Sequence, residues 1–390
     1  MAREQIARLN ALILALLFGL ATTTAASPKW CDSMRHQLSA ELRSAYHLTS
    51  HFIFRPEGKP LNDILSFHAR YSFSFSKDSR LGKLYPTAYQ GIGLGTYTYF
   101  NHSLMGTPMV LYIMQGGRIA NLSSTISVGY EWNFGFSWGW HPNGAMNSHY
   151  NVMVNVAIPF TWRCAPHWEI SLTPDYTHFS NGDTHFANAG SDMFGLRLGA
   201  TYLFDPETIK ASARRYISSS EQLQNRSFWQ HMTYDIIAYG AWRRDRFIEN
   251  KHLYYVDEPL PVAGLNFQPT YHLNNHFGLG ASLDMQYDSS LNLYDGVWDE
   301  NRKTIAYSRP PFWQQCEIGA QIRGEISAPI FTIGIGVGIN FIRHGYDASL
   351  LYTTFTLKAH LTKRLFIHIG YRRNTTQYTH NLMYGLGIRI

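Results

Sequence analysis

The chain has 390 residues and a formal net charge of +6, and only 15% of its residues are Asp, Glu, Lys or Arg. Aromatic residues make up another 15%, which excludes a disordered chain, because disordered segments are rich in charge and poor in aromatics. No apolar run of about 18 residues follows the N-terminal segment, which excludes a bundle of transmembrane helices. The basic residues are scattered and form no stripe that would bind nucleic acid. This composition favours an all-β fold, an antiparallel transmembrane β-barrel of the outer membrane.

The first residues have the features of a secretory signal. Arg3 and Arg8 form a basic region, residues 12–20 are apolar, and residues 22–26 are small. This order predicts a signal peptide over 1–26 that is cleaved near Ala26, so that the mature chain of 27–390 reaches the bacterial outer membrane. The alternative is a membrane-anchoring helix, but the apolar stretch is short for a span.

The mature chain consists of segments whose side chains alternate between apolar and small or polar types. In the clearest segment the apolar set is Ile126, Val128, Tyr130, Trp132, Phe134 and Phe136, and the interleaved set is Ser127, Gly129, Glu131, Asn133 and Gly135. The segment 331–341 repeats this pattern. Successive residues of a strand point to opposite faces, so one face suits lipid and the other suits a barrel lumen.

The alternation predicts up to sixteen strands, with twelve or fourteen as open alternatives. The predicted segments are 36–47, 65–76, 87–100, 109–120, 123–138, 150–163, 167–179, 191–204, 230–242, 261–272, 277–287, 313–325, 329–342, 350–360, 364–373 and 379–390. Short connections follow most even-numbered strands, and most of the loops after odd-numbered strands are longer. Short periplasmic turns and long outer loops are typical of outer-membrane barrels.

One connection breaks this rule and divides the strands eight and eight. Residues 206–229 contain Pro206 and a polar run that could be helical, and we expect them on the periplasmic side. The two halves show no convincing sequence repeat. We therefore predict a single barrel over 27–390, with 230–390 as additional strands.

Three polar residues are predicted to share one lipid-facing edge. His178 and Ser180 lie two apart on a strand and therefore point to the same side, together with Tyr176. The returning strand places Asp192 on its apolar face, across the hairpin from them. Polar and ionisable groups that face lipid are costly and indicate a function. A nucleophile, a base and a carboxylate together would provide a catalytic function. The alternative is an ordinary polar rim near the lipid head groups.

The residues of this hairpin resemble the lipid A 3-O-deacylases (PagL-type outer-membrane enzymes), and especially their longer relatives, the acyloxyacyl hydrolases. The specific similarity lies in the runs HFSNG at 178–182, NAGSD at 188–192 and GLRLG at 195–199. A looser similarity extends over 36–205, which we take as a deacylase-like portion, and nothing specific is similar after residue 230. The deacylases are smaller barrels, so the resemblance leaves the additional strands unexplained.

The resemblance implies a serine esterase that removes an ester-linked acyl chain from lipid A or lipopolysaccharide. It implies Ser180 as the nucleophile, His178 as the general base and Asp192 as the acidic third member, where the best-known deacylases carry Glu. Asn188, Gly190 and, more weakly, Asn181 are implied near the oxyanion or the substrate. The scheme needs no metal and no cofactor. Its partners are acyl chains and membrane lipid, and a homodimer is left open.

Two alternatives remain open from the sequence. A calcium-dependent outer-membrane phospholipase A carries a similar His-x-Ser-Asn-Gly run, but with Asn in place of the acidic third member. A non-catalytic pore or structural barrel is the other, because about sixteen strands can enclose a water channel. The run Gly135–Gly139 also fits the hydrolase motif G-x-S-x-G, but that motif needs a strand-to-helix turn, so we expect a structural role for Ser137.

Overall fold

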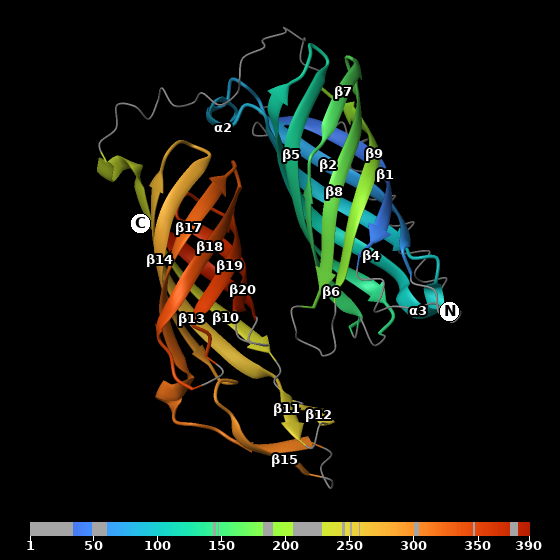
Figure 1. The fold of residues 1–390 in the computed structure, drawn as a ribbon. Helices are drawn as coiled ribbons and strands as arrows, with labels where there is room; N and C mark the ends of the chain where they lie inside the picture. The colour runs from blue at the N-terminus through green and yellow to red at the C-terminus, as the bar shows by residue number, and fades with distance from the viewer. Residues whose placement is uncertain are drawn as a thin grey trace, which may run out of the picture.

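A computed structural model describes residues 34–48, 61–142, 146, 148–181, 190–205, 228–243, 246–249, 252–256, 258–299, 304–345, 348–374 and 381–390. Antiparallel strands of this part of the chain form two separate barrels, one from each half (Figure 1). The predicted signal peptide, most of the 206–229 connection and Asn188 lie outside the described residues. No helix in the described ranges is both long and apolar enough to cross a membrane.

The first barrel is built from the strands of the N-terminal half. They are β1 (Met34–His47), β2 (Asp63–Phe75), β3 (Ala88–Thr98), β4 (Gly106–Asn121), β5 (Ile126–Trp140), β6 (Tyr150–Ala157), β7 (Phe160–Ala165), β8 (Trp168–Ser180) and β9 (Ser191–Leu203). β6 and β7 both lie between β5 and β8, and act as one strand interrupted near Pro159. The short helices α2 (Arg80–Leu84) and α3 (His102–Met105) lie in connections of this barrel.

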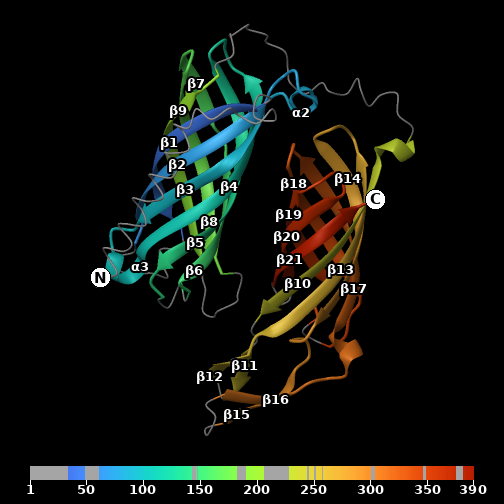
Figure 2. The same cartoon turned by 180° about the vertical axis from the view of Figure 1, so that it is seen from behind.

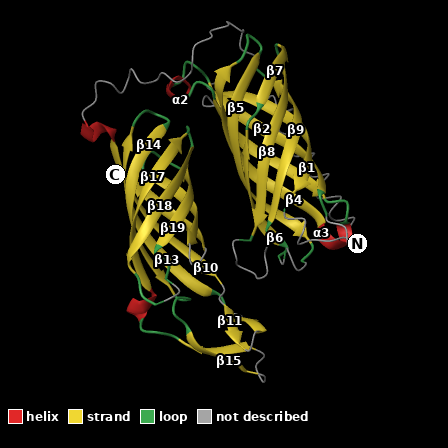
Figure 3. Ribbon diagram, viewed as in Figure 1, coloured by secondary structure: helices red, strands yellow, loops and turns green. Residues whose placement is uncertain are grey.

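The second barrel closes with eight strands. They are β10 (Met232–Arg243), β13 (Leu260–His272), β14 (Phe277–Asp288), β17 (Cys316–Ser327), β18 (Phe331–Ile342), β19 (Leu351–His360), β20 (Leu365–Asn374) and β21 (Asn381–Arg389). Two hairpins extend from its loops: β11 (Arg246–Glu249) with β12 (His252–Tyr255), and β15 (Tyr294–Asp299) with β16 (Thr304–Ser308). The 3-10 helices η4 (Phe228–His231) and η5 (Phe312–Gln315) precede β10 and β17. Strands dominate both halves in the view coloured by secondary structure (Figure 3).

This topology corrects the single large barrel predicted over 27–390. β9 returns to pair with β1 from Gln37↔Leu203 to His47↔Met193, so the first ring has no free edge for β10. β10 pairs instead with β21, the last strand of the chain. The sixteen predicted segments all overlap barrel strands, with 150–163 divided into β6 and β7, but they close as two rings.

The outer and inner faces follow the predicted alternation. On β18 the side chains of Ile335, Val337 and Ile339 are exposed on the outside, where lipid would surround the barrel. On β5 the buried residues Glu131 and Asn133 point into the lumen. The fold is therefore the outer-membrane β-barrel that the composition predicts.

Ion pairs fill the lumen of the first barrel. Arg43 pairs with Asp175 at 2.6 Å, Arg70 pairs with Glu41 and with Glu131, and Arg197 contacts the carboxylates of all three acids. Each of these side chains is almost fully buried. Three cations balance three carboxylates, as buried charges require.

The second barrel holds a lumen network of its own. Lys358 Nζ lies 2.7 Å from Asp235 and 2.6 Å from Glu325, and Arg323 also pairs with Glu325 at 3.1 Å. Eight strands give an interior that side chains fill. The argument for a pore depended on one ring of about sixteen strands, and the two rings remove that argument.

The two barrels contact each other along outer faces. Trp132 of β5 points outward, but it is only 7% exposed because Phe331 of β18 and Leu357 of β19 cover it. The Trp132 and Phe331 rings lie 5.4 Å apart, edge to face. Near α2, the Tyr85 hydroxyl donates to the backbone oxygen of Asn275 at 3.1 Å. The view from behind also shows the barrels lying beside each other (Figure 2).

Candidate active site

The end of β8 presents the predicted residues on the outside of the first barrel. Thr177 and Phe179 are almost fully buried in the lumen, so the alternate residues Tyr176, His178 and Ser180 point outward. All three are partly exposed. The side chains therefore lie on the face that the sequence predicts.

The strand register brings His178 and Asp192 together. The two residues are direct partners in the β8–β9 pairing. His178 Nδ1 lies 2.7 Å from Asp192 Oδ1, and the side chains are 37% and 23% exposed. The carboxylate accepts a hydrogen bond from Nδ1–H, which fixes the tautomer and leaves Nε2 as the ring nitrogen that can accept a proton.

Ser180 completes the alignment along the strand. It lies two residues beyond His178, so their Cα atoms are roughly 6.7 Å apart and their side chains share one face. Val152 and Val154 of β6 pair with Ser180 and His178, respectively. Ser180 is the last residue of β8, where the strand ends beside the loop to β9.

Tyr176 is a member of this cluster to which the sequence assigned no role. Its hydroxyl donates to Asp192 Oδ1 at 2.5 Å, the same oxygen that His178 contacts. Its ring packs against Phe194 with centroids 5.3 Å apart. The alternation of side chains along the strand predicts that Tyr176 lies on the same face as His178, but the hydrogen bond to Asp192 depends on the β8–β9 register.

Gly190 lies directly beside the imidazole of His178. Its φ is +69°, a conformation that side chains rarely adopt. A Cβ at this position would lie 3.0 Å from His178 Cε1. Glycine thus lets the chain turn into β9 while passing close to the histidine. Among the other residues implied near the oxyanion, Asn181 is buried at the end of β8, and Asn188 lies outside the described residues.

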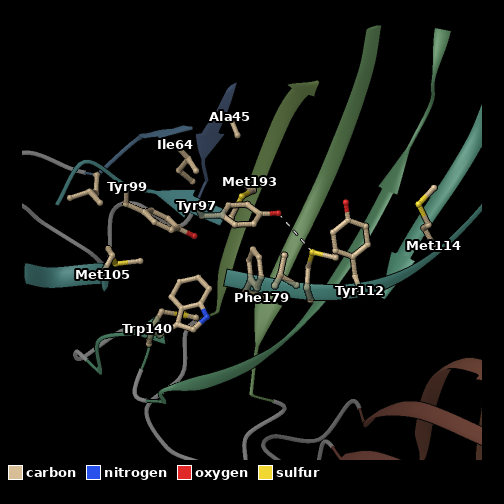
Figure 4. Close-up of a cluster of buried hydrophobic side chains, with 14 residues drawn as sticks. Ala45, Ile64, Tyr97, Tyr99, Met105, Tyr112, Met114, Trp140, Phe179 and Met193 are labelled. Carbon is tan, nitrogen blue, oxygen red and sulfur yellow. Dashed lines mark hydrogen bonds between the residues drawn. The ribbon is translucent and has the colours of Figure 1, made fainter. Parts of the chain in front are cut away.

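A packed interior supports the hairpin from behind (Figure 4). Phe179, between His178 and Ser180, points into the lumen. Its ring centroid lies 5.2 Å from that of Tyr97 and 5.1 Å from that of Trp140. Burying an aromatic ring in this way contributes roughly 2 kcal/mol. The strand end is therefore fixed, and with it the direction of the two outward side chains.

A second interior contact fixes the start of β9. The hydroxyl of Ser191 lies 2.9 Å from His47 Nε2 and 3.0 Å from the Tyr99 hydroxyl. All three side chains are fully buried. Asp192 also accepts a backbone hydrogen bond from Leu48, which ties β9 to the end of β1. Asp192 is thus held in place by a hydrogen bond to its backbone as well as by hydrogen bonds to its side chain.

The surface around the polar cluster is apolar and exposed. Phe194, Leu196 and Leu198 continue along the outer face of β9, with 58%, 47% and 57% of their surface exposed. Val154 and Val156 do the same on β6. A hydrocarbon chain could lie along this surface while its ester group reaches His178 and Ser180.

Two other sequence patterns have structural explanations. Ser137 of the G-x-S-x-G run is fully buried in β5, where its hydroxyl donates to the Asn151 backbone oxygen at 2.8 Å and accepts from Trp140. It has the structural role that the sequence predicts. Among the residues that the structure describes, no three His, Cys, Asp or Glu side chains cluster closely enough to hold a metal ion.

Comparison with known proteins finds a family match for the second barrel. Residues 232–390 match the family model PagL_C, described as acyloxyacyl hydrolase, C-terminal domain. This is the part of the chain in which the sequence analysis found no specific similarity. No curated protein matches the chain.

Solved structures of outer-membrane barrels are similar only at a low level. Neisserial surface protein A is 11% identical with a TM-score of 0.28, over 44% of this chain and 96% of that chain. The siderophore receptor PirA from Pseudomonas aeruginosa is 8% identical with a TM-score of 0.22, over 91% and 80%. The translocator domain of NalP from Neisseria meningitidis is 7% identical with a TM-score of 0.18, over 100% and 95%.

The family match and the hairpin residues lie on different barrels of one chain. The match covers the second barrel, whereas His178, Ser180 and Asp192 lie on the first. The second barrel is therefore similar to the acyloxyacyl hydrolase C-terminal domain, and this match supports the PagL-type outer-membrane family that the residues of the first barrel predict.

Proposed function

We propose that this protein is an outer-membrane serine esterase that removes an ester-linked acyl chain from lipid A or lipopolysaccharide. The observation that carries the proposal is the hydrogen bond of 2.7 Å between His178 and Asp192 on the lipid-facing side of a barrel, with Ser180 next on the same face. The family match of the second barrel supports a hydrolase of this kind.

In the first step His178 acts as the general base. Nε2 takes the hydroxyl proton of Ser180 while Oγ forms a bond to the ester carbonyl carbon, and the carbonyl π electrons move to its oxygen. Asp192 stabilises the imidazolium that results, because its carboxylate contacts Nδ1. Tyr176 donates a hydrogen bond to the same carboxylate oxygen.

The tetrahedral intermediate then collapses. The C–O bond to the glycolipid breaks, and the leaving alkoxide takes the proton from His178 Nε2. A water molecule attacks the acyl-serine with His178 again as base, which releases the fatty acid and restores Ser180. Hydrogen-bond donors in the loop before Gly190, where Asn188 lies, are proposed to stabilise the oxyanion, an effect often worth about 3 kcal/mol.

The place of the cluster in the fold explains how such a substrate could arrive. The cluster lies at the end of the first barrel whose connections are 48–62, 99–105, 141–149 and 181–190, and two of the three connections at the opposite end, 122–125 and 166–167, are much shorter than these while the third is 76–87. Long loops face the cell exterior in this class of barrel, and lipopolysaccharide occupies that leaflet. Its acyl chains could approach the outer face of β8 sideways without leaving the bilayer.

The test compares lipid substrates directly. Purified full-length protein is mixed with lipid A and, separately, with a glycerophospholipid, each with and without chelator, and the released fatty acids are identified by mass spectrometry. We expect chelator-insensitive release from lipid A and none from the Ser180→Ala variant. Chelator-sensitive release from phospholipid alone would instead favour the phospholipase A alternative, and equal release by the variant would remove Ser180 as the nucleophile.

A further inference from the structure

A serine, a histidine and a tyrosine form a hydrogen-bonded cluster in the lumen of the first barrel, directly behind Asp192. Ser191 Oγ lies 2.9 Å from His47 Nε2 and 3.0 Å from the Tyr99 hydroxyl. The rings of His47 and Tyr99 also pack edge to face, with centroids 5.6 Å apart. Figure 4 shows Tyr99 among the buried apolar side chains that surround it. Because all three side chains are fully buried, a lipid ester cannot reach Ser191, and the cluster is not a second active site.

Each hydrogen bond of this cluster has a defined direction. His47 Nδ1 lies 3.0 Å from the backbone oxygen of Leu61, and a carbonyl oxygen can only accept, so Nδ1 carries a proton. The neutral ring then accepts at Nε2, which makes Ser191 the donor of that bond. Ser191 in turn accepts from the Tyr99 hydroxyl. The serine hydroxyl is thus held from two sides, and it links β9 to β1 and to the residue that follows β3.

The cluster anchors β9 at a point where the pairing of this strand with β1 has stopped. The register between the two strands ends at Met193, so Ser191 lies two residues beyond the last pair. Gly190, with its φ of +69°, directly precedes it and has no side chain that could anchor the turn. Successive residues of a strand point to opposite faces, so a hydroxyl held inside the lumen keeps the carboxylate of Asp192 outside, opposite His178.

We propose that this cluster positions the candidate active site: by holding the start of β9 from the lumen, it aims the carboxylate of Asp192 at His178 Nδ1. Its three members, Ser191, His47 and Tyr99, are therefore positioning residues and contact no substrate. The inference rests on the proposed function, because the direction of this carboxylate matters for ester cleavage only if His178 is the base. It extends the site through the barrel wall into the lumen.

The same barrel contains a matched control cluster on other strands. Ser66 Oγ lies 3.1 Å from His68 Nε2, and His68 Nδ1 lies 3.2 Å from the Tyr112 hydroxyl. These side chains are also buried in the lumen. They belong to β2, which pairs with β1 and β3, and to β4, which pairs with β3 and β5. A substitution in this control cluster therefore removes the same kind of hydrogen bond from strands outside the β8–β9 hairpin.

The first experiment compares Ser191→Ala with Ser66→Ala in fatty-acid release from lipid A. A misplacement of about 1 Å can lower a rate on the order of 100-fold, and since the pairing of β8 with β9 remains, we expect kcat to fall about tenfold in Ser191→Ala with little change in KM. Ser66→Ala should leave both constants unchanged. Thermal unfolding establishes that both variants are folded at the assay temperature. Equal losses of kcat in the two variants would overturn the proposal, because the cluster would then act only through stability.

A double variant shows whether Ser191 acts through Asp192. In the Asp192→Asn background the carboxylate that the cluster aims is already absent, so the addition of Ser191→Ala should lower the residual kcat no further. A full second decrease would mean that Ser191 acts by another route, and the proposal would then be wrong.

A spectroscopic readout separates this inference from the esterase function. Nitrogen NMR of the full-length protein with isotope-labelled histidine rings reports the tautomer of His178, whose signals are assigned by their loss in His178→Ala. We expect the Nδ1–H tautomer to dominate in the unmodified protein and in Ser66→Ala, and a mixture of tautomers in Ser191→Ala. An unchanged tautomer in Ser191→Ala overturns the positioning inference, whether or not the protein releases fatty acid. If the unmodified protein releases no fatty acid but Ser191→Ala changes the tautomer, the proposed function fails and the positioning of Asp192 by the cluster stands.

Discussion

The two barrels share an architecture but differ at one hairpin. Each ring places its last strand between its first strand and the strand before it. In the first barrel the second residue of that last strand, Asp192, faces His178. In the second barrel the equivalent residue, Leu382, faces Tyr371, and Arg373 occupies the position that Ser180 has in the first. The same strand arrangement therefore places Asp192 opposite His178 in one barrel and Leu382 opposite Tyr371 in the other.

This difference shows that the fold alone does not locate the function. The family match falls on the second barrel, whose last hairpin lacks the polar set, whereas the candidate active site lies on the first. Function resides in sites that are carried by folds. The comparison can be tested by changing matched positions in the two barrels.

The largest effect is expected at the imidazole. His178→Ala removes the base, so we expect fatty-acid release to fall by about 10⁶-fold, as for the base of a catalytic triad. Tyr371→Ala changes the equivalent position of the second barrel and should leave release unchanged. The measurement is the initial rate of fatty-acid release from lipid A in detergent. Equal losses in both variants would mean that the hairpin of the first barrel has no special role.

The carboxylate gives the next largest effect. Asp192→Asn keeps the size of the side chain but no longer stabilises the imidazolium or enforces its tautomer, and comparable changes lower kcat by about 10⁴-fold. Asp192→Glu restores the acid that the best-known deacylases carry, so it should retain much more activity than Asp192→Asn. If Asn and Glu at this position are equally active, the pairing of Asp192 with His178 has no part in catalysis.

The sequence predicts the faces of the strands but not how their edges join. Side-chain alternation placed His178, Ser180 and Asp192 on the outer face, and the structure agrees. Closure depends on pairs far apart in the chain, such as Gln37↔Leu203, and alternation contains no information about such partners. The division of the strands eight and eight at 206–229 was the one available signal for two rings.

The interior was less predictable for a related reason. Lumen residues such as Arg43 and Lys358 read only as polar positions in the sequence, because their partners Asp175 and Asp235 lie 132 and 123 residues away. The hydrogen bond of Tyr176 was equally hidden. It depends on the register between β8 and β9. A shift of this register by one residue would turn the side chains of one strand to the opposite face.

A substitution of Lys358 can show whether the second barrel contributes to the stability of the protein and not to the reaction. Lys358→Met leaves Asp235 and Glu325 without their shared cation, and we expect unfolding to become easier by about 3–5 kcal/mol. Thermal unfolding followed by circular dichroism measures this change. Fatty-acid release per folded molecule should stay the same, since the active-site hairpin belongs to the first barrel. A loss of release without a loss of stability would show that the second barrel takes part in the reaction.

Two glycines with similar backbones allow a matched comparison. Gly190→Ala would place a Cβ 3.0 Å from His178 Cε1 at a φ of +69°, which strains the chain by roughly 1–2 kcal/mol and shifts the ring. We expect a decrease in kcat of about 10- to 100-fold, measured with lipid A. Gly345→Ala has a similar φ of +74° in the second barrel, and its Cβ would collide with Asn292. It should lower thermal stability but not kcat, and equal effects on kcat would show that Gly190 acts only through the fold.

The smallest effect is expected at Tyr176, which acts through Asp192. Tyr176→Phe removes one of the two side-chain donors to Asp192 Oδ1 but keeps the ring contact with Phe194. A hydrogen bond to a charged group is worth about 1.5–3 kcal/mol, so we expect kcat to fall about tenfold with little change in KM. Tyr384→Phe, on the outer face of the last strand of the second barrel, is the control. A rise in KM at constant kcat would instead make Tyr176 a substrate contact, because a residue that orients the carboxylate affects the chemical step and not the binding of lipid.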